Sequence, residues 1–275
     1  MRTSTAGRPL VLGQMLAARW RSTLWWSVGT AALVLLVLAA YPSVRDSSSG
    51  FDSYLDSLPE GVVDLIGAQA GLASPSGYLN SQMYSNIFPL LLIVMGIGAA
   101  SWAVAGSESE GTLEMLLANP VTRTRAAVER FAGVVVVTGV VALVATVVTA
   151  LMLPVVDLTG LPGEAVWAAG LGSWTLALSF SAVSFGVGAA TGSRPAALGS
   201  GSAAAAGTYV VFGLTAFVDS VEPLRWVCPW FWFLDADPLG GADATFWWQA
   251  VALPLAVAGA FAAGGVARLV RRDIG

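Results

Sequence analysis

The sequence alternates between long apolar runs and shorter segments that hold every charged residue. Each run contains 18 to 25 residues without Asp, Glu or Arg, which is the length that an α-helix needs to cross the hydrocarbon core of a bilayer. The pattern predicts an all-α membrane protein with six transmembrane helices in a single transmembrane domain over residues 1–275. The predicted spans are 24–41, 87–105, 131–153, 166–190, 198–218 and 246–267.

Composition supports lipid as the surrounding solvent and excludes several functions. Hydrophobic residues make up 56% of the chain, charged residues 11%, and the mean hydropathy is +0.74, whereas soluble chains are about 25% charged. The chain has no lysine and no histidine, which excludes a Walker A phosphate loop, a histidine-based triad and a zinc-protease helix. We therefore expect no catalytic residue, no metal and no cofactor bound by this chain.

The arginines predict the orientation, because cytoplasmic segments retain more basic residues than external ones. With the N-terminus in the cytoplasm, eleven of the 13 arginines lie inside, and only Arg45 and Arg225 lie outside. We expect a multi-pass protein of the cell inner (cytoplasmic) membrane with both termini cytoplasmic. The eleven are Arg2, Arg8, Arg19, Arg21, Arg123, Arg125, Arg130, Arg194, Arg268, Arg271 and Arg272.

Several segments outside the spans are predicted to lie at the membrane surface. Apolar residues at near-helical spacing predict an amphipathic N-terminal helix in the inner interface that leads into the first span. Periodic positions in 51–58 and 62–66 predict two short helices in the first outer loop. The aromatic residues of the last outer loop favour a hairpin that dips into lipid, with a ligand cage as the alternative. The N-terminal set is Val11, Leu12, Met15, Leu16 and Trp20, and the loop set is Trp226, Trp230, Phe231, Trp232 and Phe233.

Four features inside or beside the spans carry local predictions. Tryptophans at the span ends are expected to anchor the interfaces, and Pro254 is expected to kink the sixth helix. Small residues in the fourth and fifth spans permit close helix packing. Hydroxyl residues in the third and fourth spans could contact cargo, but hydrogen bonds within the helix bundle are the favoured interpretation. These are Trp25, Trp26, Trp167, Trp247 and Trp248 for the belts, Gly186, Gly188, Ala189, Gly199, Gly201, Ala205 and Gly207 for packing, and Thr146, Thr149, Ser179, Ser181 and Ser184 for the hydroxyls.

The second cytoplasmic segment, 106–130, is the most informative part of the chain. Three glutamates keep it out of the hydrocarbon, and Leu113, Leu116 and Leu117 follow helical spacing. We expect a two-turn helix that ends at Asn119-Pro120, because proline disfavours helix in the residue before it. Thr122 is expected to cap the helix that continues into the third span.

This short helix has an apolar stripe that needs a partner. One possibility is that it lies on the inner leaflet. Anionic head groups would repel Glu108, Glu110 and Glu114, so a protein partner is favoured.

The same run resembles a motif in the membrane subunits of ABC-2 type transporters. The matching residues are Glu-Gly-Thr-Leu-Glu at 110–114, the leucine pair at 116–117 and Pro-Val-x-Arg at 120–123. The six-span layout, the lead-in helix and the elaborated last outer loop also look like this family. The resemblance implies that the run is a coupling helix that docks on a separate ATPase. The implied ATPase contacts are Glu110, Gly111, Thr112, Leu113, Glu114, Leu116, Leu117, Pro120 and Arg123.

The resemblance implies the rest of the assembly. The chain would be the permease subunit of an ATP-driven exporter, acting as a dimer with two copies of an ABC ATPase subunit, and ATP and Mg would bind that partner. We expect a homodimer in membrane lipid and no nucleic-acid partner, with the fifth span, at Gly199 and Gly201, as the first choice for the dimer contact. The substrate stays open, because cargoes vary widely in this family.

Three other classes compete with this interpretation. An ion-coupled secondary transporter usually carries ionisable residues at membrane depth, and the six runs have none. An intramembrane serine protease would need a histidine or a Gly-x-Ser-x-Gly elbow, and the sequence has neither. A non-transporting assembly or immunity subunit is compatible with the sequence. A neighbouring gene for a Walker-motif ATPase would favour the exporter over the secondary transporter and the protease. A transport assay would separate the exporter from an assembly or immunity subunit.

Overall fold

The computed structural model describes residues 10–46, 74–106, 122–215 and 217–272, and within these ranges all regular secondary structure is helical. Six of the helices are long and apolar enough to cross a membrane, as the sequence predicts. The α-helices are α1 (Leu10–Asp46), α4 (Pro75–Leu79), α5 (Ile87–Ser101), α8 (Arg123–Met152), α9 (Ala165–Thr191), α10 (Arg194–Thr215), α11 (Pro229–Asp235) and α12 (Leu253–Arg271). The π-helical turns are η1 (Asn80–Tyr84), η2 (Trp102–Gly106) and η4 (Phe246–Ala252), and η3 (Asp219–Val227) is a 3-10 helix.

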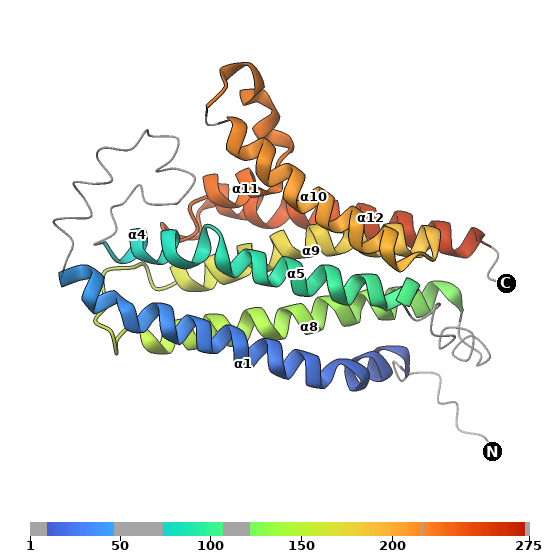
Figure 1. Ribbon diagram of the computed structural model, residues 1–275, viewed down its shortest axis with the longest axis horizontal. Coiled ribbons are helices and arrows are strands. Elements are labelled where there is room, and N and C mark those ends of the chain that lie inside the picture. The colour runs from blue at the N-terminus through green and yellow to red at the C-terminus, as the bar shows by residue number, and fades with distance from the viewer. Residues whose placement is uncertain (1–9, 47–73, 107–121, 216, 273–275) are drawn as a thin grey trace.

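Helix α9 forms the centre of the bundle. It packs against α5, α8, α10 and α12, whereas α1 lies at the edge and packs mainly on α8 (Figure 1). Helix α10 diverges from the other spans, so that its second half and η3 stand apart from the bundle. The spans α5 and α9 are the most buried, and α10 is the least buried.

Glycine allows the closest approach of two spans, which is that of α9 and α12. A Cβ added to Gly265 would lie 2.7 Å from the Cα of Gly186, and a Cβ added to Gly186 would lie 2.7 Å from the carbonyl oxygen of Phe261. Side chains cannot be accommodated at such distances without moving a backbone. The expected role of small residues in the fourth span is therefore confirmed at Gly186.

The first span is longer than predicted. Helix α1 has 37 residues, or about 55 Å at 1.5 Å per residue, against about 30 Å of hydrocarbon. The expected lead-in helix is continuous with the first span, because residues 10–46 form one helix, and its position in the inner interface stays a prediction. Of its apolar set, Val11 and Met15 are buried and Trp20 is exposed, and Met15 packs on Gly133 of α8.

Pro254 marks a change of helix type in the sixth span. The span begins as the π turn η4 and becomes the α-helix α12 at Leu253. Proline has no N–H to give to the carbonyl four residues earlier, which here belongs to Ala250. That carbonyl accepts a hydrogen bond from the hydroxyl of Thr175 on α9. The helix type therefore changes next to Pro254, and a hydroxyl from the neighbouring span compensates for the missing N–H, whereas the kink itself stays a prediction.

The aromatic residues of the last predicted loop do not enter lipid as a group. Trp226 is 53% exposed, but the residues from Trp230 to Phe233 on α11 are at most 8% exposed. They pack between α10, α9 and η4, so the lipid-dipping hairpin is wrong for this stretch. The clustered aromatic side chains that suggested insertion into lipid instead pack beside α10, where this helix diverges from the bundle.

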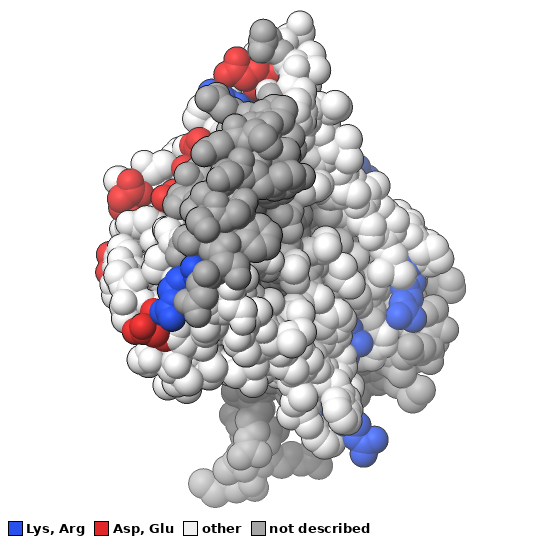
Figure 2. Space-filling model, turned by 60° about the vertical axis from the view of Figure 1, so that its left-hand side comes forward, with Lys and Arg blue, Asp and Glu red and all other residues white. Residues whose placement is uncertain are grey.

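Charge separates the two ends of the bundle. We call the end at which α1 begins and α12 finishes the arginine-rich end, and the opposite one the acidic end (Figure 2). The described arginines at the first are Arg19, Arg21, Arg123, Arg125, Arg130, Arg194, Arg268, Arg271 and Arg272, and the acidic residues at the second are Asp157, Glu164, Glu222, Asp235, Asp237 and Asp243. Helices that alternate in direction bring these residues together from distant parts of the chain.

Candidate functional site

The predicted ATPase-contact residues Glu110, Gly111, Thr112, Leu113, Glu114, Leu116, Leu117 and Pro120 lie outside the described residues. The two ends of their segment are described, and both lie at the arginine-rich end of the bundle. Of the predicted contacts, only Arg123 is described.

The start of α8 is fixed by two contacts. Thr122 accepts a hydrogen bond from the backbone N–H of Arg125 at 3.3 Å, so its predicted role as the N-cap is confirmed. The Arg123 guanidinium donates to the backbone carbonyl oxygen of Arg272 at 2.7 Å. Arg123 therefore joins the start of α8 to the end of α12, and its contact with an ATPase stays a prediction.

The next two turns of α8 carry a charged pair that faces two other helices. The Glu129 carboxylate accepts from the N–H groups of Val11 and Leu12 at 3.0 and 3.1 Å, in the first turn of α1. Arg130 is 8% exposed and donates to the backbone carbonyl of Ala103 in η2. A carboxylate at a helix N-terminus and a guanidinium at a helix C-terminus both complement the helix dipole.

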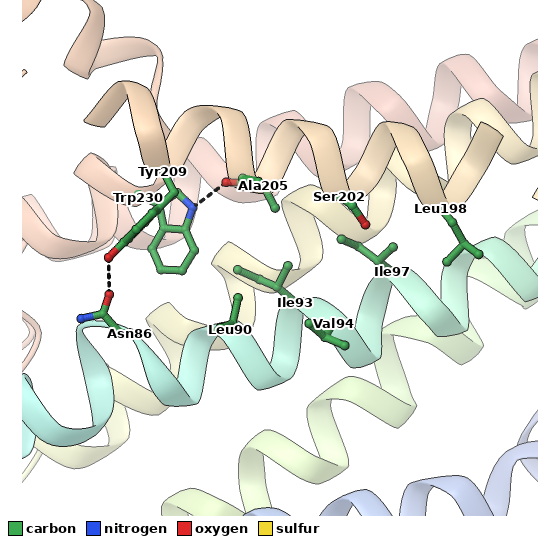
Figure 3. Close-up of a pocket in the computed structure, with 11 residues that line it drawn as sticks. Asn86, Leu90, Ile93, Val94, Ile97, Leu198, Ser202, Ala205, Tyr209 and Trp230 are labelled. Atoms are coloured by element: carbon green, nitrogen blue, oxygen red, sulfur yellow. Dashed lines mark hydrogen bonds between the residues drawn. The ribbon is translucent and has the colours of Figure 1, made fainter. Parts of the chain in front are cut away.

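A cavity of about 470 Å³ lies between α5 and α10. Figure 3 shows two rows of side chains facing each other across it, one row from each helix. The lining is apolar apart from one amide, one serine and the polar edges of two aromatic rings. It consists of Asn86, Leu90, Ile93, Val94 and Ile97 from α5 and the residue before it, Leu198, Ser202, Ala205, Ala206 and Tyr209 from α10, and Trp230 from α11.

The cavity is closed toward the acidic end by three polar contacts. The Tyr209 hydroxyl donates to the Asn86 side-chain oxygen at 2.6 Å. Trp230 donates its ring N–H to the Ala205 carbonyl at 3.1 Å, and its ring meets that of Tyr209 edge-on at 4.9 Å between centroids. These interactions are drawn in Figure 3. Tyr209 thereby joins α10 to the residue before α5, and α11 packs against α10 at the same level.

Sequence reasoning did not identify this cavity. The position of Asn86, just before the apolar run, did not indicate a role in the cavity. A single tyrosine hydroxyl inside a span, as at Tyr209, does not distinguish a cavity residue from a packing residue. Trp230 was assigned to lipid. The hint in the sequence was the fifth span, whose Ser202 and Ala206 leave room beside larger residues on α5.

Of the five hydroxyl residues, Ser184 makes the expected hydrogen bond between helices, whereas the other four donate within their own helices. Thr146 and Thr149 donate to carbonyls four residues earlier in α8, and Ser179 and Ser181 donate within α9. Ser184 donates to the Ile97 carbonyl of α5 at 3.4 Å. None of the five lines the cavity between α5 and α10.

The tryptophan belts are largely as predicted. Four of the five expected anchors point out of the bundle, with exposed fractions of 48% to 72%. Trp26 is partly buried and packs against the core. The four are Trp25, Trp167, Trp247 and Trp248.

Together these features define a multi-pass α-helical membrane protein with an apolar cavity between two spans. A family profile for ABC-2 family transporter proteins matches residues 17–220, which is well over half of the chain. The chain therefore belongs to the ABC-2 transporter family, as the motif at 110–123 indicates. No curated protein matches the sequence.

Proposed function

We propose that this chain is the permease subunit of an ATP-driven exporter, and that two copies form the substrate pathway with two ATPase subunits. The cavity between α5 and α10 is the observation that carries the proposal. Its volume of about 470 Å³ exceeds the about 310 Å³ of a groove between α8 and α9. It also lies beside the least buried span, where a second copy has room to pack.

The lining indicates the class of cargo. Apolar side chains along both walls favour an apolar or amphipathic molecule, because burying a charge among them without a partner is costly. Asn86, Ser202 and Tyr209 offer the hydrogen-bonding groups that could orient a polar end. We propose an amphipathic substrate whose apolar part lies along Ile93 and Ile97.

The energy for transport comes from the partner in this proposal. ATP and Mg bind the ATPase subunits, which dock on the arginine-rich end through residues 110–117. That end is then cytoplasmic, in agreement with the positive-inside rule. The chain itself supplies the pathway and carries out no chemistry.

The experiment uses the chain co-expressed with an ABC ATPase from the same genome. Co-purification tests assembly, and ATP-dependent uptake of rhodamine 6G, an amphipathic cation, into inside-out vesicles tests export. Ala206→Phe should fill the cavity and reduce uptake at least about fivefold, because the residue is exposed and lines it. Ala260→Phe, an equal change at an exposed position of α12, should retain uptake.

The outcomes separate the competing classes. Uptake that follows a proton or sodium gradient without ATP would indicate a secondary transporter. A complex that hydrolyses ATP but moves no amphipathic probe would favour an assembly or immunity subunit. Equal uptake by Ala206→Phe and Ala260→Phe would show that the cavity is not part of the substrate pathway.

A further inference from the structure

The end of α5 at the arginine-rich side changes its helix type while it is still packed inside the bundle. After Ser101 the helix widens into the π turn η2, Trp102–Gly106. Single π turns inside α-helices concentrate at functional sites. Because each residue turns an α-helix by about 100°, conversion of η2 to α geometry would rotate one flank of the turn against the other by about that angle. The π form and an α form of this turn would therefore differ by a discrete change of register.

Arg130 contacts this turn from α8. Its guanidinium donates to the Ala103 carbonyl, and both residues are buried. The carbonyls at the end of a helix carry the negative end of its dipole, so a cation there is stabilising. Hydrogen bonds to charged groups are also stronger than those between neutral groups.

Two further contacts fit η2 to its surroundings. The Arg19 guanidinium of α1 lies 5.3 Å from the centre of the Trp102 ring. A Cβ added to Gly106 would lie 2.8 Å from Cδ1 of Trp102, so the ring occupies the space that a side chain at 106 would need. Helices α1 and α8 thus both contact this turn of α5, which also packs against α9 and α10.

We propose that Arg130 is a positioning residue that holds η2 in its π form, and that a change of η2 toward α geometry couples ATPase movement to α5. The coupling role rests on the proposed function. Arg130 contacts neither the cavity nor a nucleotide in this scheme. It acts through α5, whose Ile93 and Ile97 line the cavity two to three turns away.

The first test measures η2 directly and needs no cargo. Hydrogen–deuterium exchange of the full permease–ATPase complex should show the amides of 98–106 exchanging about 10- to 100-fold faster in Arg130→Gln than in the native chain, as expected for loss of a charge-assisted bond. Arg130→Lys, which keeps a charged donor, should restore part of the protection. Arg268→Gln removes the same charge from an exposed site at the same end and should leave 98–106 unchanged.

The second test measures coupling. Rhodamine 6G transported per ATP hydrolysed should fall at least about fivefold in Arg130→Gln while ATP hydrolysis continues, and Arg268→Gln should keep the native ratio. If Arg130→Gln does not assemble, Gly106→Ala provides an uncharged change of the same turn. It should show the same faster exchange and the same lower ratio.

The outcomes distinguish the two proposals. A native complex that neither binds an ATPase nor hydrolyses ATP would refute the proposed function. A coupled native complex in which Arg130→Gln, or Gly106→Ala where it is used, keeps both the native exchange and the native ratio would refute the role of Arg130. Faster exchange at an unchanged ratio would also refute the coupling role, because it would leave Arg130 with a structural role alone.

Discussion

Glu129 and Arg130 are adjacent on α8 but stabilise opposite ends of two different helices. Glu129 accepts hydrogen bonds from the N-terminal turn of α1, and Arg130 donates to the C-terminal turn that follows α5. Each charge has the sign that the nearby helix end favours. One pair of residues thus aligns three helices at the arginine-rich end.

The contact of Glu129 with α1 should contribute measurably to stability. Glu129→Ala leaves the N–H groups of Val11 and Leu12 without their acceptor, and loss of a helix cap costs about 0.5–2 kcal/mol. Arg125→Gln, which removes the partly exposed ion pair to Glu129 and leaves the cap in place, should cost no more than about 1 kcal/mol. Thermal unfolding in detergent compares the two. Equal losses would mean that the ion pair, and not the cap, dominates.

Cys228 should react slowly with thiol reagents. The side chain is 2% exposed, and burial raises the pKa of its thiol above the usual value. The reactive thiolate is therefore scarce at neutral pH, and its fraction rises only as the pH approaches that higher pKa. Maleimide labelling of the folded native chain at pH 7 should be much slower than in denaturant. Rapid labelling at pH 7 would contradict the packing of α11.

The orientation can be tested at the predicted coupling helix. In a Cys228→Ser background, a cysteine introduced at Glu110 should be reached by impermeant maleimide in inside-out vesicles and not in intact cells. A cysteine introduced at Asp157, at the acidic end, should show the reverse. Labelling of position 110 in intact cells would invert the proposed topology.

The dimer contact predicted from small residues needs revision before it is tested. Gly201 cannot take part, because a Cβ there would lie 2.9 Å from Cβ of Ser184 within the same chain. Gly199 and Gly207 have open space beside them. Gly207→Leu should therefore weaken crosslinking between copies in membranes, whereas Gly259→Leu, at an equally open site on α12, should not. Similar crosslinking in both variants would move the interface away from α10.

The coupling helix predicted from sequence gives the largest expected contrast. Burying a leucine side chain contributes about 1.5–3 kcal/mol before association costs, and a rim charge contributes about 0–1 kcal/mol. Leu116→Asp should therefore abolish ATPase co-purification or ATP-dependent transport, while Glu114→Gln should reduce them little. Membrane insertion should be normal in both. A Leu116→Asp protein with native assembly and transport would show that this segment is a surface element.

The sequence predicted what depends on patterns along one helix. Six spans, the Thr122 cap and the irregularity at Pro254 all follow from runs, spacing or a missing N–H. It did not predict what depends on which helices become neighbours. Trp230 was assigned to lipid because its partners, Tyr209 and Ala205, lie about 20 positions earlier in another helix. Arg130 was used only to predict the orientation in the membrane. The residues around it in the sequence do not indicate that its side chain would donate a hydrogen bond to Ala103.

The short connection between α9 and α10 has a mechanical consequence. Only Gly192 and Ser193 separate the two helices, and Gly192 has a left-handed backbone, with φ of 69°. Helix α10 is thus a lever about 33 Å long, from its 22 residues at 1.5 Å each, with its fulcrum at the arginine-rich end. A tilt of about 5° at Gly192 would carry its far end through roughly 3 Å by this length. Tyr209 lies 15 residues after Arg194 on this helix, or about 23 Å along it, so the same tilt would move it by about 2 Å. That is enough to break the 2.6 Å hydrogen bond between the oxygens of Tyr209 and Asn86, so a small angle at one end of the bundle opens a contact near the other.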